Sequence, residues 1–226
     1  YFYKQWKKLK DYANSKGIKI IGDLPIYVAS NSADTWQHPK LFCFDKHLKI
    51  KAVAGCPPDY FSKKGQLWGN VLYDWEAMKK DNYSWWEQRI KHSFLLYNVL
   101  RLDHFRGFAS YWAIRYGEKT AINGRWKIGP RIQFFRDLER KVKNIDIIAE
   151  DLGTLTADVF KLLRQTNYPN MKVLQFGLTE WDNMYNPKNY PENSVAYTGT
   201  HDNMPIVEWY DNLNEKEKNI CDRSEE

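Results

Sequence analysis

The chain has 226 residues, of which 43% are hydrophobic and 16% are aromatic, and its net charge is +6. This length and apolar content are enough for one large domain or two small ones with a real core. The basic residues are scattered and form no nucleic-acid motif, so we expect no nucleic-acid partner. No apolar run is long enough to cross a bilayer and no signal peptide opens the chain, so we expect no membrane contact either.

The cysteines bear on the cellular compartment. Cys43, Cys56 and Cys221 are odd in number and show no CxxC spacing. This pattern favours a reducing environment and argues against a zinc site, and no His/Cys cluster indicates another transition metal. We therefore predict a cytoplasmic protein that uses no metal ion and no other cofactor.

In chain order, the first predicted element is an amphipathic helix over residues 2–16. Its apolar side chains recur at helical spacing, and Gly17 is placed to close its C-terminus. A strand over residues 18–22 follows, and Asp23 comes directly after it. The chain starts without Met inside the helical pattern and ends in a polar tail, so we expect a piece of a longer protein.

Two long stretches lack a helical period. Residues 29–80 and 107–130 are rich in Trp, Tyr and Phe, with Gly and Pro scattered among them. We predict that both are loop insertions in a single partial catalytic domain spanning residues 1–226, and that residues 41–53 form a small hairpin. Loops of this length in a compact domain are commonly functional. The aromatic side chains suit stacking on flat ligands, although packing is the more frequent role of any single one.

Helices and strands alternate through the rest of the chain. A capping-box pattern formed by Ser84 and Glu87 predicts one helix start. Pro130 stands where a first-turn proline would begin the next helix, and Thr156 is placed to cap the one after it. The predicted strands lie at about residues 18–22, 98–102, 145–149, 171–177 and 195–199.

This alternation predicts the fold class. Alternating strands and helices build a parallel sheet with right-handed crossovers. Acidic residues follow several of the strands, which is typical of (β/α)₈ barrels and of doubly wound sheets. No Gly-rich phosphate loop opens a helix, and this favours the barrel. Since a full barrel takes about 250 residues, we predict an α/β fold that is an incomplete (β/α)₈ TIM barrel with long, aromatic-rich loop insertions.

The segment around Asp103 carries the strongest chemical signal. Side chains alternate along a strand, so Arg101 and Asp103 share one face and His104 lies on the other. An arginine two residues before the aspartate would keep its carboxylate ionised and fixed in direction. A pinned, ionised carboxylate at a strand end is a candidate nucleophile. A purely structural ion pair is the alternative.

Further carboxylates follow other strands. Glu150 comes after an apolar run, so desolvation could raise its pKa and suit it to general acid/base work. Asp202 follows His201 and could grip sugar hydroxyls. Two carboxylates of unlike protonation are what the cleavage of a glycosidic bond requires. Asp23, which precedes Pro25, could equally shape a turn, and both His104 and His201 could be hydrogen-bonded scaffold.

Six segments together resemble one family. They read GDLPIYV at 22–28, PPDYF at 57–61, GQLWGN at 65–70, RLDHFRGF at 101–108, IAEDLG at 148–153 and YTGTHDN at 197–203. In this order they resemble the amylomaltases, which are 4-α-glucanotransferases related to the α-amylases. The resemblance implies a (β/α)₈ barrel of which this chain supplies strands three to seven, and a double-displacement transfer without a cofactor.

The resemblance also assigns roles. By matching position, Asp103 is the nucleophile, Glu150 is the acid/base and Asp202 is the third carboxylate. Residues expected to bind substrate are Arg101 and His201 beside the carboxylates, Asp23 and Tyr27 in the first motif, and Asp59, Tyr60, Phe61, Gln66 and Trp68 in the loop that covers the glucan. The implied partners are malto-oligosaccharides and other 1,4-α-glucans. A retaining α-glucan hydrolase and an inactive glucan-binding fragment stay open as alternatives, and the oligomeric state is left open.

Overall fold

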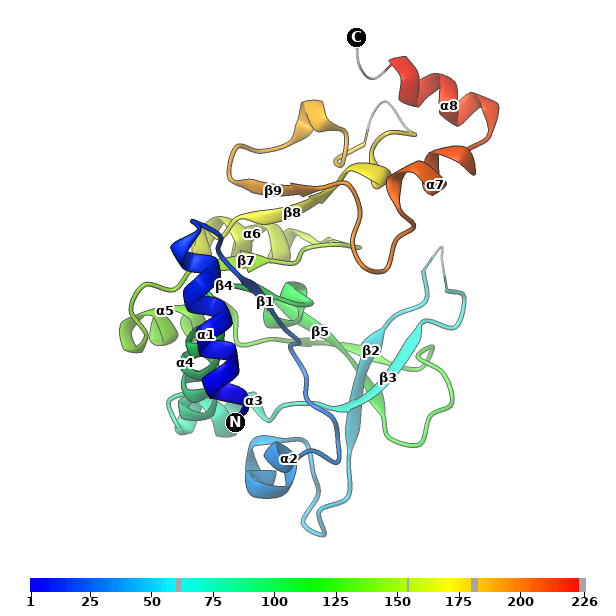
Figure 1. Cartoon of the computed structure of the whole chain (residues 1–226). Helices are drawn as coiled ribbons and strands as arrows, with labels where there is room; N and C mark the ends of the chain where they lie inside the picture. The colour runs from blue at the N-terminus through cyan, green and yellow to red at the C-terminus, as the bar shows by residue number, and fades with distance from the viewer. Residues whose placement is uncertain (60–61, 154, 180–182, 224–226) are drawn as a thin grey trace.

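The structure is a computed structural model that describes residues 1–59, 62–153, 155–179 and 183–223. At its centre is a five-stranded sheet in which each strand runs parallel to its neighbours (Figure 1). The order across the sheet is β1-β4-β7-β8-β9, which is also the order along the chain. The strands are β1 (Ile21–Leu24), β4 (Val99–Leu102), β7 (Ile147–Ala149), β8 (Asn170–Val173) and β9 (Ser194–Tyr197). The predicted five-stranded parallel sheet is therefore confirmed.

Helices lie along one side of this sheet (Figure 1). Neighbouring helices pack on one another in the order α1, α4, α5 and α6, and α4 contacts both β1 and β4. Parallel strands need crossover connections of this kind, which are usually helices. The helices are α1 (Phe2–Ser15), α4 (Ser84–Leu96), α5 (Arg131–Lys141) and α6 (Ala157–Thr166), with the short α7 (Ile206–Asp211) and α8 (Glu215–Asp222) after β9.

A second sheet forms where loops were expected. It is antiparallel, in the order β3-β2-β5-β6, and it joins the two aromatic-rich stretches to each other. The same stretches also hold short helices, and an antiparallel bridge between Phe44 and Ile50 forms the predicted hairpin. The elements are β2 (Ala52–Cys56), β3 (Gln66–Val71), β5 (Ser110–Arg115), β6 (Arg125–Ile128), α2 (Ala33–Gln37) and α3 (Trp75–Lys80).

Of the five strands, β1 and β8 differ most from their predicted bounds. β1 begins at Ile21 rather than at residue 18, so Asp23 lies inside the strand and pairs in register with Arg101. β8 ends at Val173, and a 3₁₀ helix over Leu174–Phe176 continues the apolar run that was expected as strand. An apolar run alone does not distinguish a strand from a buried turn of helix.

The start of α4 was predicted wrongly. Its N-cap is Tyr83, with a left-handed φ of +54°, and Ser84 is already the first helical residue. The Ser84 hydroxyl donates a hydrogen bond to the Asp81 carboxylate, and Glu87 pairs with Lys91 at 2.7 Å. The tight turn out of α3 moves the helix start by one residue, so the capping box cannot form.

Other helix ends follow the sequence more closely. Gly17 has a φ of +75° just beyond the C-cap of α1, where the absence of a Cβ permits the left-handed conformation. Pro130 is the N-cap of α5 rather than its first residue. Thr156 is the N-cap of α6, but its hydroxyl donates to Asp158 at 2.5 Å and does not cap a backbone amide.

An aromatic core lies behind the carboxyl end of β4. The 3₁₀ helix Phe105–Phe108 follows directly after Asp103 and His104, and its two phenylalanines are fully buried. Phe108 stacks on Phe134 of α5 with ring centroids 5.1 Å apart. Close packing of this kind leaves little freedom to the chain that leaves β4, so the residues before Phe105 are held in a fixed position.

Candidate active site

The register of the parallel sheet brings the strand ends together. Leu102 of β4 pairs with Leu24 of β1 on one side and with Ala149 of β7 on the other. Asp103 and Glu150 each follow one of these paired residues, so they emerge at the same edge of the sheet. The predicted meeting of the two carboxylates at one edge is thus present in the structure.

Glu150 is buried and held by two backbone amides. The amide of His104 donates to its Oε2 at 2.6 Å, and the amide of Leu152 donates to its Oε1 at 2.8 Å. Only 9% of the residue is exposed, and desolvation raises its pKa to about 7, with a further upward contribution from Asp103. The two amide donors and Arg101 act in the opposite direction. The predicted raised pKa is confirmed, and its main cause is the predicted one.

Arg101 lies between two aspartates. Its Nη1 is 2.5 Å from Asp23 Oδ1 and 3.1 Å from Asp103 Oδ1, so the expected contact with Asp103 is present but is the longer of the two. Burial raises the pKa of Asp103 although Arg101 lowers it, and the charges of Asp23 and Asp202 raise it further. The expected contact with Arg101 fixes the direction of the Asp103 carboxyl group, but Asp23 shares the guanidinium and partial desolvation sets the pKa of Asp103 above its usual value.

His104 has a larger part in the site than its sequence indicated. Its φ of +50° turns the chain sharply after β4, and this turn directs its amide at Glu150. Its ring meets the Trp68 ring edge to face, with centroids 4.8 Å apart. Burial and the nearby Arg106 lower the pKa of His104 to about 3, so the imidazole is neutral at physiological pH. Histidine is one of the residues enriched at positive φ, but the sequence alone did not indicate this turn.

The antiparallel sheet brings aromatic side chains to the same place. Trp68 of β3 packs on His104 and is 6.4 Å from the Tyr27 ring, and its indole donates to Gln66 Oε1 at 2.9 Å. Trp68 is 36% exposed, whereas Tyr27 is buried. Three of the predicted binding residues come from this region. Trp68 offers an accessible ring face, and Gln66 orients the Trp68 indole through its hydrogen bond. Tyr27 is buried and lies next to the Trp68 ring.

The preceding part of the same loop is less informative. Asp59 is exposed, and its carboxylate accepts a hydrogen bond from the amide of Ser62 at 2.7 Å. This contact engages the Asp59 carboxylate within the chain. Tyr60 and Phe61 lie outside the described residues, so their predicted role stays a prediction.

His201 and Asp202 lie on the loop that follows β9. They contact each other at 3.5 Å and have side chains that are 74% and 82% exposed. Asp202 is near enough to raise the pKa of Asp103. The buried Gln175 holds this loop, because its amide donates to the carbonyl of Met204 at 2.8 Å. Sequence reasoning missed Gln175, and the one available signal was a single polar residue inside an apolar run.

Neither a metal centre nor a membrane-spanning helix is found among the described residues. Within them, no group of three or more His, Cys, Asp or Glu side chains is arranged to hold a metal ion. In the same part of the chain, no helix has the length and apolar content needed to span a bilayer.

Comparison with known proteins now adds to this geometry. A family model described as 4-alpha-glucanotransferase matches residues 1–225. The chain belongs to this family. It is 51% identical over 219 residues to a 4-alpha-glucanotransferase of Clostridium butyricum, covering 96% of this chain and 45% of the relative. It is 50% identical over 218 residues to a chloroplastic/amyloplastic 4-alpha-glucanotransferase of Solanum tuberosum, covering 96% of this chain and 38% of the relative.

Solved structures of the family agree with the fold. An amylomaltase from Streptococcus agalactiae in complex with acarbose superposes with a TM-score of 0.94 at 43% identity, covering 98% of this chain and 45% of that one. An amylomaltase from Corynebacterium glutamicum, at 19% identity and a TM-score of 0.77, shares the fold. The chain thus spans less than half the length of the relatives it matches. The predicted α/β fold, with a sheet that is part of an amylomaltase barrel, is confirmed.

Proposed function

We propose that the protein to which this chain belongs is a 4-α-glucanotransferase, which moves a segment of a 1,4-α-glucan onto the 4-hydroxyl of another glucan or of glucose. The observation that carries the proposal is the pair Asp103 and Glu150 at neighbouring strand ends, with the pKa of Glu150 raised to about 7. A carboxyl group with that pKa can give up and regain a proton near neutral pH. Membership of the family supports the same reaction.

Each carboxylate then has a role that its surroundings support. Glu150 protonates the glycosidic oxygen while Asp103 attacks the anomeric carbon, and a covalent glycosyl-enzyme forms. Glu150 next accepts the proton of the acceptor hydroxyl, so two inversions retain the α-linkage. Asp202 and His201, on an exposed loop, are free to contact the sugar at the cleaved bond. We predict a separation of about 5–5.5 Å between the Asp103 and Glu150 carboxyl groups, as retaining enzymes require, and a crystal structure would measure it.

The proposal for substrate binding rests on the side chains around the two carboxylates. Trp68 exposes an aromatic face beside His104, and such faces pack on the apolar side of a sugar ring. Arg101 holds the carboxylates of Asp23 and Asp103 in position through its two ion pairs. The related Streptococcus agalactiae amylomaltase was solved in complex with acarbose, which supports malto-oligosaccharides as the substrate class.

The deciding experiment uses the longer protein and maltotriose. Glucose together with a ladder of longer maltodextrins, resolved by size, would establish transfer. Glucose and maltose with no longer product would instead identify an α-glucan hydrolase, which has the same carboxylates but accepts water. No turnover by a folded protein would favour the glucan-binding alternative.

A cytoplasmic location is also part of the proposal. It is supported by the odd number of cysteines and the absence of CxxC spacing. Fractionation of the source cells, followed by detection of the protein, tests it. Recovery from an organelle or from the medium would contradict it.

A further inference from the structure

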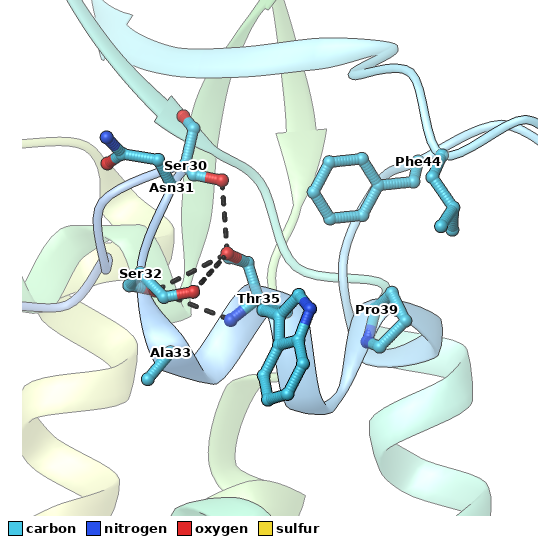
Figure 2. A pocket seen from close by; sticks show the side chains of 9 residues that line it. Ser30, Asn31, Ser32, Ala33, Thr35, Pro39 and Phe44 are labelled. Carbon is cyan, nitrogen blue, oxygen red and sulfur yellow. Dashed lines mark hydrogen bonds between the residues drawn. The ribbon is translucent and has the colours of Figure 1, made fainter.

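A hollow lies on the surface beside α2, and none of the three carboxylates lines it. It has a volume of about 550 Å³, within the range of small-molecule sites. Its lining combines polar and apolar side chains. Figure 2 shows Ser30, Asn31 and Ser32 on one side of it and Phe44 on the other, and Trp36 and Leu48 complete the apolar part.

The backbone around this hollow is fixed by its own hydrogen bonds. The Ser32 hydroxyl accepts from the amide of Thr35 at 3.3 Å and caps α2, while the Thr35 hydroxyl donates to the carbonyl of Ser30 at 3.0 Å (Figure 2). The Trp85 indole donates to Asp34 at 3.1 Å and ties α2 to α4. The hollow is therefore preformed, and a ligand would pay little ordering cost on entering it.

Trp36 is the unusual side chain of the group. It is 85% exposed on a helix that is otherwise anchored, although tryptophan is highly buried on average. Nearby, the exposed Asn31 amide makes no hydrogen bond to any part of the chain that the structure describes. The Ser30 hydroxyl donates to Gly69 and can still accept a hydrogen bond. An accessible indole beside unused amide and hydroxyl groups matches a sugar, which has an apolar face and a polar rim.

Hydrogen bonds to β3 link the edge of the hollow to the candidate active site. The Ser30 hydroxyl is bound to the carbonyl of Gly69 at 2.6 Å, and the Asn70 amide is bound to the carbonyl of Val28 at 3.0 Å. Gly69 directly follows Trp68, which packs on His104 beside Glu150. One strand, β3, thus supplies the aromatic face in the site and the support of the hollow.

We propose that this hollow is a distal subsite for the same α-glucan chain, with Trp36 as the stacking face and Asn31 and Ser30 as hydrogen-bonding partners. The inference rests on the proposed function, because it takes the polymeric substrate from there. A chain held at both places binds more tightly than one held only at the carboxylates, since the second contact is intramolecular. Short substrates, which fill only the catalytic centre, gain nothing from it.

The test compares Trp36→Ala with the unsubstituted longer protein on maltotriose and on amylose. The KM for amylose should rise about tenfold, the effect of losing one aromatic contact, while kcat and all constants for maltotriose stay within about twofold. Trp36→Phe should recover most of the loss. Tyr12 on α1 is another exposed aromatic residue, so Tyr12→Ala is the matched control. It should change the kinetic constants for neither maltotriose nor amylose.

Retardation in native gels that contain amylopectin measures binding without turnover. Trp36→Ala should lose part of the retardation and Tyr12→Ala none. Unchanged retardation and an unchanged KM for amylose in Trp36→Ala would overturn the subsite. So would a lower melting temperature with unchanged glucan binding, because Trp36 would then pack against another part of the longer protein. If the unsubstituted protein fails on maltotriose but shows retardation that depends on Trp36, the transferase proposal fails and the subsite stands.

Discussion

The ends of β4 and β7 differ from the loop after β9 in how they hold their carboxylates. Glu150 is 9% exposed and bound by two backbone amides, and Asp103 is partly buried beside Arg101. Asp202 has a side chain that is 82% exposed, and it contacts His201, whose side chain is also largely exposed. The first pair is adjusted by desolvation, which shifts the pKa of both groups upward. The side chains of His201 and Asp202 are instead accessible to a ligand that enters from solvent.

This difference suggests that the buried pair and the exposed loop residues have separate roles. Proton transfer and nucleophilic attack need groups whose charge state is set in advance, and burial sets it. Binding a sugar needs side chains that can contact the ligand and change rotamer to fit it, and exposed side chains can do both. The following substitutions, made in the longer protein, test whether the two groups of residues have these separate roles.

The largest effect is expected for Asp103→Asn. The amide keeps the size of the side chain but cannot attack the anomeric carbon, so transfer from maltotriose should fall on the order of 10⁴-fold or more. Retardation by amylopectin in native gels should persist, because the binding surface is intact. Substantial remaining turnover would mean that Asp103 is not the nucleophile.

The next effect concerns the turn at His104. A β-branched valine at φ +50° is strained, so His104→Val should displace the amide that binds Glu150 and lower kcat roughly tenfold to 100-fold. Since that hydrogen bond lowers the pKa of Glu150, its loss should also move the alkaline limb of the pH profile to higher pH.

His104→Gly is the matched control for the backbone. Glycine adopts positive φ without strain, so the amide and the alkaline limb should be retained while the contact with Trp68 is lost. Identical pH profiles for the valine and glycine variants would contradict the role of the backbone amide.

A third expectation concerns the pH profile of kcat/KM for the unsubstituted protein. Glu150 must be protonated to act as the acid, so activity should fall as the pH rises through about 7, approaching tenfold per pH unit beyond that. Asp103 must be ionised, so activity should also fall as the pH drops through a value above the ordinary aspartate range. Because the two groups interact, the profile reports the pair. A profile that stays flat well above pH 7 would exclude Glu150 as the acid.

The smallest effect concerns the position of the acid limb of that same profile in the variant Asp202→Asn. Removing its charge lowers the pKa of Asp103, so the acid limb should move to lower pH. The alkaline limb, which Glu150 sets, should stay where it is. A displaced alkaline limb would show that the two parts of the site are more strongly coupled than their burial indicates.

The sequence predicted the parallel sheet because each strand is a short apolar run that ends in polar residues. It did not predict the antiparallel sheet. β2 pairs with β5 across a long sequence separation, and β6 is exposed along its whole length, so no local alternation reveals either pairing. The shared use of Arg101 was also hidden, because Asp23 becomes its partner only through the register of β1 with β4. Local patterns specify elements, whereas contacts between distant segments depend on register.

The amide of His104 has a consequence for the time course of folding. Glu150 receives one hydrogen bond from Leu152, two residues away, and the other from His104, 46 residues away. The local bond can form as soon as the turn after β7 closes, but the distant one requires β4 and β7 to be docked side by side. Contacts between distant segments form slowly. A refolding protein should therefore regain its helical circular dichroism before it regains turnover, with Glu150 as one of the last groups to acquire its full set of hydrogen bonds.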